Sequence, residues 1–301
     1  MIAFIFSGQG NEYSCMAKEL YENNSYAKDF IDNLKLNFDF KKIFIFESDK
    51  IHDTRYSQIG NFVLNFILAK MIEKNNIKAD VCAGLSLGEY NALCYANVID
   101  YKNAISILEK RSELMYEALI SKNTGMYAIM FFDLEIICQI IKKYDGVYIT
   151  NYNSPDQIVI AGDNDKLNNC VKECIDRGAK KVVKLDVIGA FHCELLKNAS
   201  KKFSNFLNKY NFYKNNIPIY FNYTGNKSND NITQLLVKQM YNPVLFEKII
   251  KNMISDGVDE IYAIGLGNSI KNFIRSICIH YKYKINIFHI EKMKDLEIFK
   301  K

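Results

Sequence analysis

Short apolar stretches alternate with amphipathic ones along most of the chain, and this alternation restricts the fold more than any other feature. A long helix is expected from Ser57, as its N-cap, to about Asn75, because apolar side chains recur there at helical spacing. Strands that alternate with helices are typical of an α/β architecture with a mostly parallel sheet. The apolar stretches with the length of buried strands are 2–6, 79–84, 217–222 and 259–265.

A different order interrupts this pattern between residues 124 and 189. Six stretches follow one another there as strand, helix, strand, strand, helix and strand. This βαββαβ order is typical of a ferredoxin-like unit. The sequence therefore predicts a large α/β subdomain formed by residues 1–123 and 190–301, with a small ferredoxin-like subdomain inserted at 124–189.

The composition argues against several classes of protein. The 301 residues are 49% hydrophobic and 24% charged, as expected of a globular chain with a substantial core. The formal net charge of +5 comes from lysines spread among acidic residues, which does not favour nucleic-acid binding. The apolar run at the N-terminus is too short for a signal peptide or a membrane span. Because the eight cysteines contain no C-x-x-C pair, we expect reduced thiols, no metal site and a cytoplasmic location.

The pentapeptide Gly84-Leu85-Ser86-Leu87-Gly88 lies between a predicted strand and a predicted helix. Gly-x-Ser-x-Gly in that context is typical of a nucleophile elbow, in which a sharp turn exposes a serine hydroxyl. A purely structural turn that needs small residues is the alternative. As an elbow, the motif makes the large subdomain hydrolase-like and Ser86 the catalytic nucleophile. The N–H of Leu87 would then donate to a developing oxyanion at the helix N-terminus.

A serine nucleophile needs a base, and the chain has four histidines. His192 follows a predicted strand and a small-residue turn, where an α/β sheet assembles its site. His52 lies in a polar loop, and His280 and His289 lie near the C-terminus, so these three are poorer candidates. Glu194 is a weak candidate to orient His192, and a backbone carbonyl is the alternative.

Two further polar residues are candidates for the site. Gln9 lies between glycines after the first strand, at the sheet edge expected for Ser86, and could supply a second oxyanion donor. Arg111 lies within a predicted helix at 101–120, where it could occupy the exposed face or point inward. An inward guanidinium needs an anionic group to offset its desolvation, and a carboxylate bound by two hydrogen bonds would provide one.

Six motifs, in order, resemble those of the malonyl-CoA:acyl carrier protein transacylases, the acyltransferases of fatty-acid and polyketide synthesis. The stretches FSGQG, GLSLGEYNAL and LEKRSELM resemble the family's N-terminal loop, serine elbow and arginine helix. The stretches NYNSPDQIVIAG, GAFHCELL and KQMYNPVLFEKII resemble its asparagine segment, histidine turn and glutamine passage. The resemblance extends along nearly the whole chain.

The resemblance implies a ping-pong reaction. Ser86 would take the malonyl group from malonyl-CoA, with His192 as base and then acid, and Gln9 and Leu87 would form the oxyanion hole. The phosphopantetheine thiol of acyl carrier protein would then accept the group. The resemblance also implies a monomer, with no bound cofactor or metal.

Further roles follow from the same resemblance. Arg111 would bind the malonyl carboxylate, and Gln239 would orient His192 through its main-chain carbonyl. Asn153, together with Asn151, would line the cleft between the subdomains. Phe191 resembles the bulky residue of malonyl-selective members, so we expect malonyl to be preferred over methylmalonyl.

The chain departs from the family pattern at three positions. Leu85 replaces a frequent histidine, Glu12 a common glutamine and Leu266 a common proline, and none of these is expected to touch a catalytic atom. Two other functions use the same fold. An acyl hydrolase of a polyketide pathway would pass the acyl group to water, and a non-catalytic module would only dock carrier protein. The sequence does not distinguish a fatty-acid from a polyketide carrier.

Overall fold

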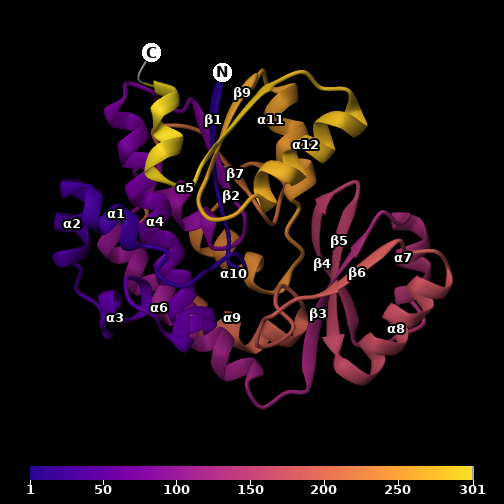
Figure 1. The fold of residues 1–301 in the computed structure, drawn as a ribbon. Helices are drawn as coiled ribbons and strands as arrows, with labels where there is room; N and C mark the ends of the chain where they lie inside the picture. Colours follow the sequence, from indigo (N-terminus) through magenta and orange to yellow (C-terminus); the bar gives the residue numbers. More distant parts are fainter. Residues whose placement is uncertain (229, 300–301) are drawn as a thin grey trace.

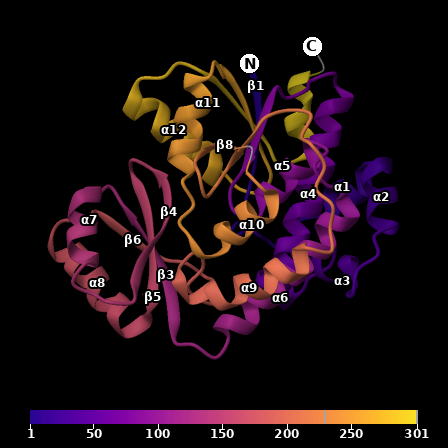
Figure 2. The same ribbon diagram turned by 180° about the vertical axis from the view of Figure 1, so that it is seen from behind.

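The computed structural model describes residues 1–228 and 230–299 and contains two separate sheets (Figures 1 and 2). The larger sheet has the order β10-β9-β1-β2-β7-β8, and all its neighbouring pairs are parallel except β7 with β8. Its strands are β1 (Ile2–Phe6), β2 (Val81–Gly84), β7 (Ile219–Phe221), β8 (Asn226–Lys227), β9 (Glu260–Ile264) and β10 (Asn286–Ile290). The predicted α/β class with a mostly parallel sheet is confirmed.

Helices cover both faces of the larger sheet, and β1 shows how the two faces differ. Phe4 and Phe6 point into the cluster that includes α4, α5, α6, α9 and α10, whereas Ala3 and Ile5 point toward α11 and α12. The helices of this part are α1 (Lys18–Asn23), α2 (Ser25–Asp32), α3 (Phe40–Phe44), α4 (Thr54–Lys74), α5 (Gly88–Tyr95), α6 (Tyr101–Leu119), α9 (Lys197–Leu207), α10 (Ile232–Tyr241), α11 (Phe246–Ser255) and α12 (Ser269–Tyr281). The 3₁₀ segments are η1 (Asp49–His52), η2 (Glu194–Leu196) and η3 (Met293–Phe299).

The smaller sheet is antiparallel and has the order β4-β5-β3-β6, with α7 and α8 packed on one face. Its elements are β3 (Thr124–Met130), α7 (Leu134–Ile141), β4 (Val147–Ser154), β5 (Gln157–Asp163), α8 (Asn164–Asp176) and β6 (Lys181–Lys184). The predicted βαββαβ order and its ferredoxin-like strand arrangement are confirmed. The residue boundaries 1–123, 124–189 and 190–301 stay a prediction.

A short main-chain pairing joins the smaller sheet to the rest of the molecule. The N–H of Tyr152 donates to the carbonyl of Val244 at 2.9 Å, and the N–H of Val244 donates to the carbonyl of Thr150 at 2.9 Å. Val244 lies between α10 and α11, so these bonds fix β4 against the larger part. No helix among the described residues is both long and apolar enough to cross a bilayer.

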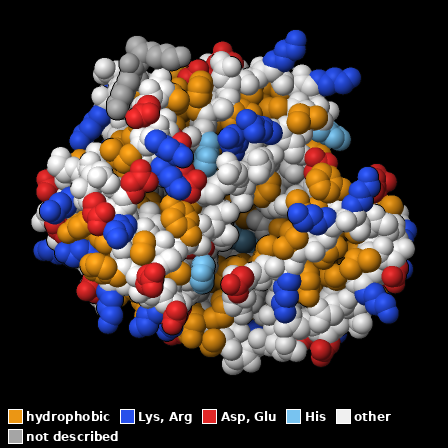
Figure 3. Space-filling model, viewed as in Figure 1, with side chains coloured by type: hydrophobic (Ala, Val, Ile, Leu, Met, Phe, Trp, Pro, Cys, Tyr) orange, Lys and Arg blue, Asp and Glu red, His pale blue; other side chains and the backbone are white. Residues whose placement is uncertain are grey.

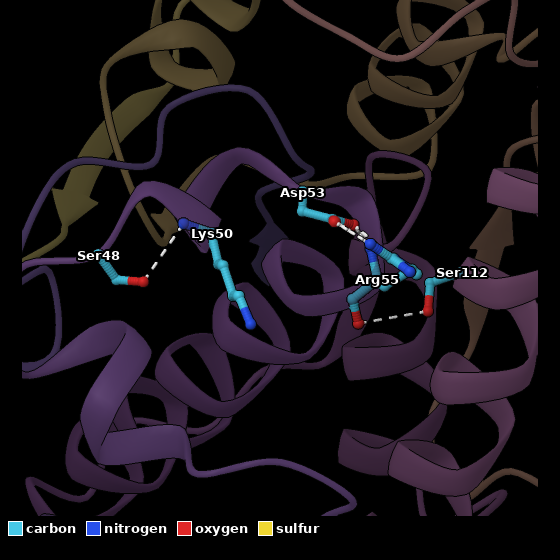
Figure 4. A network of polar contacts seen from close by, with 5 residues as sticks. All are labelled: Ser48, Lys50, Asp53, Arg55 and Ser112. Carbon is cyan, nitrogen blue, oxygen red and sulfur yellow. Dashed lines mark hydrogen bonds and ion pairs between the residues drawn. The ribbon is translucent and has the colours of Figure 1, made fainter. Parts of the chain in front are cut away.

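The start of α4 differs from its prediction. The helix begins at Thr54, its N-cap is Asp53, and Ser57 is buried inside the first turns, so the predicted Ser57 cap is wrong. Figure 4 shows the network that fixes this end: Asp53 accepts from the Arg55 N–H at 2.9 Å and pairs with its guanidinium. The hydroxyl of Ser112 on α6 donates to the Arg55 carbonyl. A paired carboxylate therefore caps the helix.

Candidate active site

The nucleophile elbow lies between β2 and α5, and Ser86 is the residue of the elbow with a strained backbone conformation. Ser86 has φ of 52°, whereas neither Gly84 nor Gly88 has a positive φ. A Cβ at Gly84 would collide with the main chain of Gly88, and a Cβ at Gly88 would collide with the carbonyl of Phe6 on β1. The two glycines therefore allow close packing of strand, turn and helix, and Ser86 takes the left-handed conformation at a cost of about 1–3 kcal/mol.

The structure brings together Ser86, His192 and Gln239. Ser86 Oγ lies 2.8 Å from His192 Nε2, and His192 Nδ1 lies 2.8 Å from the main-chain oxygen of Gln239 on α10. A carbonyl only accepts, so Nδ1 carries the proton and Nε2 is free to accept the serine proton. Glu194 is exposed and pairs with Lys197, so it does not orient His192, and that candidate role is wrong.

His192 is buried in the neutral form that a general base requires. Burial, assisted by the positive charge of Arg111, lowers the pKa of His192 to about 4. The hydrogen bond to the Gln239 carbonyl opposes this shift. The imidazole is therefore unprotonated at neutral pH and able to accept a proton from Ser86.

Arg111 points inward and is only 1% exposed, so the exposed-face alternative is wrong. Its guanidinium donates to Gln58 Oε1 at 2.6 Å, to Ser86 Oγ at 3.1 Å and to Gln239 Oε1 at 3.0 Å. No acidic side chain forms an ion pair with it within residues 1–228 and 230–299. Burial lowers the pKa of Arg111, which is the cost of holding a cation among neutral acceptors.

A relay of side-chain hydrogen bonds connects Arg111 to Gln9. Gln58 accepts from Arg111 and donates to Thr54 Oγ1 at 3.1 Å, and Thr54 Oγ1 donates to Gln9 Oε1 at 3.1 Å. Thr54 and Gln58 lie one turn apart on α4. The sequence reasoning missed both, and the signal that could have found them is a pair of polar residues on the buried side of an apolar helix.

Two main-chain N–H groups are available for an oxyanion. The N–H of Leu87, just before α5, and that of Gln9 have no hydrogen-bond partner in the described part of the chain. Gly8 packs so closely that a Cβ there would lie 2.7 Å from the carbonyl of Leu85, so the Gln9 loop lies directly beside the elbow. This arrangement suits a two-donor oxyanion hole at a helix N-terminus.

Asn222, which follows β7, is hydrogen-bonded to the main chain of the elbow. Its side chain donates to the Gly84 carbonyl at 2.6 Å and accepts from the Ser86 N–H at 2.7 Å. Glu89 on α5 accepts from the Asn222 N–H at 2.6 Å, and burial raises the pKa of Glu89 to about 7. Neither residue was predicted from the sequence. Asn222 has no local signal, because it lies 136 positions from Ser86.

Substrate space lies between the two sheets. A cavity of about 100 Å³ beside Ser86 is lined by residues of both parts, including Arg111, Phe191, Met126 and Asn151. It adjoins a groove of about 690 Å³, and Figure 3 shows the molecule hollowed on this face. Asn153 and His52 line the groove, whereas His289 bonds the Gly265 carbonyl away from it. The shape suits a long substrate whose reactive end reaches Ser86.

Comparisons with known proteins agree with this geometry. The acyl transferase domain model matches residues 3–268. A malonyl CoA-acyl carrier protein transacylase of Bacillus subtilis is 32% identical, over 92% of this chain and 90% of its own. The crystal structure of the transacylase of that name from Clostridium perfringens has a TM-score of 0.91 and 31% identity, covering 99% of this chain and 95% of its own.

A structure described as a type II polyketide acyl-carrier protein in complex with its malonyl-transacylase is also similar. It has a TM-score of 0.93 and 27% identity, and it covers 99% of this chain and 98% of that chain. The two solved structures therefore share the fold of this chain over nearly its whole length.

Proposed function

The chain belongs to the malonyl-CoA:acyl carrier protein transacylase family, and from that premise we propose that Ser86, His192 and Arg111 carry the family's reaction here. The motif resemblance found in the sequence is confirmed. The chain is an acyltransferase that moves a malonyl group from malonyl-CoA to acyl carrier protein. The roles of individual residues are our proposal.

In the first half-reaction Ser86 Oγ attacks the malonyl thioester carbonyl while its proton moves to His192 Nε2. The N–H groups of Leu87 and Gln9 stabilise the negative oxygen that develops. The C–S bond then breaks, the proton moves from His192 to the sulfur, and CoA leaves as a thiol. In the second half-reaction the phosphopantetheine thiol gives its proton to His192 and attacks the acyl-serine, and Ser86 recovers its proton.

The observation that carries the assignment of malonyl is the buried guanidinium of Arg111. It lies within hydrogen-bond distance of Ser86 Oγ, and its hydrogen-bond acceptors are all neutral. A substrate carboxylate supplies the missing anion and can accept two parallel hydrogen bonds. The Gln239 side chain accepts from the same guanidinium through Oε1 and donates through Nε2 to the main-chain carbonyl of Ser86 at 2.9 Å. One side chain therefore contacts both the cation and the elbow.

Asn153 is the remaining residue of the proposal. Its side chain is 5% exposed and lines the groove, so we expect it to lie along the path of the pantetheine arm.

The other features of the proposal concern the state of the protein. The nucleophile, base and cation all come from this one chain, which supports a monomer that needs no cofactor or metal. All eight cysteines are free, which is compatible with the proposed cytoplasmic location.

Serine labelling tests the proposed function. Wild-type protein incubated with malonyl-CoA should gain the mass of one malonyl group, and Ser86→Ala should gain none. Holo acyl carrier protein should then remove the group and become malonylated. Release of free acid without transfer would instead favour the hydrolase, and an unlabelled wild-type chain would favour the docking module.

A further inference from the structure

The face of α4 toward the loop at residues 7–12 carries a row of buried polar side chains. Their spacing of four, three and four residues places them on one side of the helix. The row consists of Thr54, Gln58, Asn61 and Asn65. Three of them bond to the loop, through Ser7, Gln9 and Glu12. The loop that presents the Gln9 N–H is thus held at three points.

Glu12 forms the contact that lies closest to the Gln9 main chain. Its two carboxylate oxygens accept from the Gly10 N–H at 3.1 and 3.0 Å, and Oε1 accepts from Asn61 Nδ2 at 2.5 Å. Gly10 has φ of 112°, a conformation that most side chains disfavour. A single partly buried carboxylate therefore connects this turn to α4.

The position of Gln9 is fixed on both sides. Gly8 lies against the Leu85 carbonyl, and Gly10 is bonded to Glu12. We propose that Glu12 is a positioning residue that fixes the Gln9 main chain for oxyanion binding, and that the ionised carboxylate performs this task. The proposal rests on the proposed function, because it assigns Gln9 to the oxyanion hole.

The ionisation of Glu12 makes the proposal testable. Burial raises the pKa of Glu12, and the hydrogen bonds from Gly10 and Asn61 oppose the rise. Among the described residues, His52 on η1 is the titratable side chain whose positive charge favours the ionised form of Glu12. As the pH falls, Glu12 takes up a proton, one oxygen becomes a donor, and its hold on Gly10 weakens.

The test measures the rate of Ser86 malonylation against pH in Glu12→Ala and Glu12→Gln, with Glu47→Gln as a charge-matched control at an exposed position. Glu12→Ala should lower kcat about 10- to 100-fold with a smaller change in KM, because a misplaced donor acts mainly on the transition state. Glu12→Gln has one acceptor and one donor end, as the protonated carboxyl does, so its rate at pH 7.5 should lie between those of wild type and Glu12→Ala. Its rate should then stay level as the pH falls through the range in which wild type loses activity, until His192 is protonated near pH 4.

Two results would overturn the proposal. One is a Glu12→Gln profile whose acid limb coincides with that of wild type. The other is a folded Glu12→Ala protein with the wild-type kcat, folding being checked by thermal unfolding. If Glu12→Ala fails to fold, the profile of Glu12→Gln still decides. An inactive wild-type chain would count against the proposed function instead, so the two failures are distinguishable.

Discussion

Arg111 performs two tasks at the scale of a single residue. Its guanidinium donates to Ser86 Oγ and provides a cation for the substrate, while its charge helps to keep His192 neutral. The hydrogen-bond acceptors of this cation are neutral oxygens of Gln58, Gln239 and Ser86, while Tyr90 and Glu89 favour its charged form without an ion pair. A carboxylate bonded directly to the guanidinium would stabilise Arg111 better, but it would also occupy the place of the substrate carboxylate.

Removal of the guanidinium should therefore change substrate preference. In Arg111→Ala the rate of malonyl loading should fall at least about 100-fold, the scale of a lost charge-assisted pair, whereas acetyl loading should change far less. Loading rates with malonyl-CoA and acetyl-CoA measure the effect, with Arg275→Ala on the exposed face of α12 as the control. Equal losses for both substrates would show that Arg111 is only structural.

Loss of the Arg111 charge has a second, electrostatic consequence that NMR can detect. In Arg111→Gln the pKa of His192 should rise from about 4, because a positive neighbour has gone while the burial remains. A native pKa below that of an unfolded histidine means that the unfolded chain binds more protons between about pH 4 and 6.5. The free energy of unfolding should accordingly rise as the pH rises across that window, and less steeply in Arg111→Gln. An unchanged His192 titration would contradict this coupling.

The residues that could be predicted from sequence are those with a local signal. Ser86 has the elbow glycines, and His192 has a small-residue turn after a strand. Gln58 and Asn222 have no such signal, because each acquires its role only through contacts with residues more than 50 positions away. The direction of Arg111 was open for a related reason, since helical spacing alone does not show which face is buried.

At the scale of elements, α4 supports the site from its first turn. Thr54 and Gln58 bond toward Gln9 and Arg111, so the start of the helix determines the relative positions of oxyanion loop and cation. The sequence predicted the helix correctly from its apolar spacing but placed its N-cap four residues too late, at Ser57 instead of Asp53. Serine and aspartate are both good caps, and only the pairing with Arg55 distinguishes the second.

Asp53→Ala should destabilise the protein by about 1 kcal/mol, the usual value of an N-cap. Burial opposes ionisation of Asp53, but the hydrogen bonds from Arg55 outweigh it and lower the pKa of Asp53. Its contribution to stability is therefore present above the pKa of an unfolded aspartate and is lost as the pH falls through the native value. Urea unfolding at pH 7 and pH 3 measures this, with the exposed Asp49→Ala as the control. A loss of stability that is equal at both pH values would contradict the role of the charge.

At the scale of the whole molecule, the two sheets together make a site that neither makes alone. Arg111 and Ser86 come from the larger part, whereas Met126 on β3 belongs to the smaller one, and all three line one cavity. The main-chain pairing of β4 with Val244 holds the two parts together at this cleft. The order of strands could be predicted from the alternation of elements, but the cavity could not, because its walls come from side chains distant in sequence.

Phe191 is the residue by which this cavity should discriminate among acyl groups. Its ring is 7% exposed and lines the cavity of about 100 Å³, which leaves little room for a methyl group on the malonyl carbon. Phe191→Ala should raise the ratio of methylmalonyl to malonyl loading by about 10-fold or more, since one methyl group is worth about 1–3 kcal/mol in an apolar pocket. Competition between the two CoA esters measures that ratio, with Phe206→Ala on α9, outside the cavity, as the control for lost core packing. Comparable loading of both esters by the wild-type protein would show that the ring does not select, and the walls contributed by the smaller sheet would then be the next to alter.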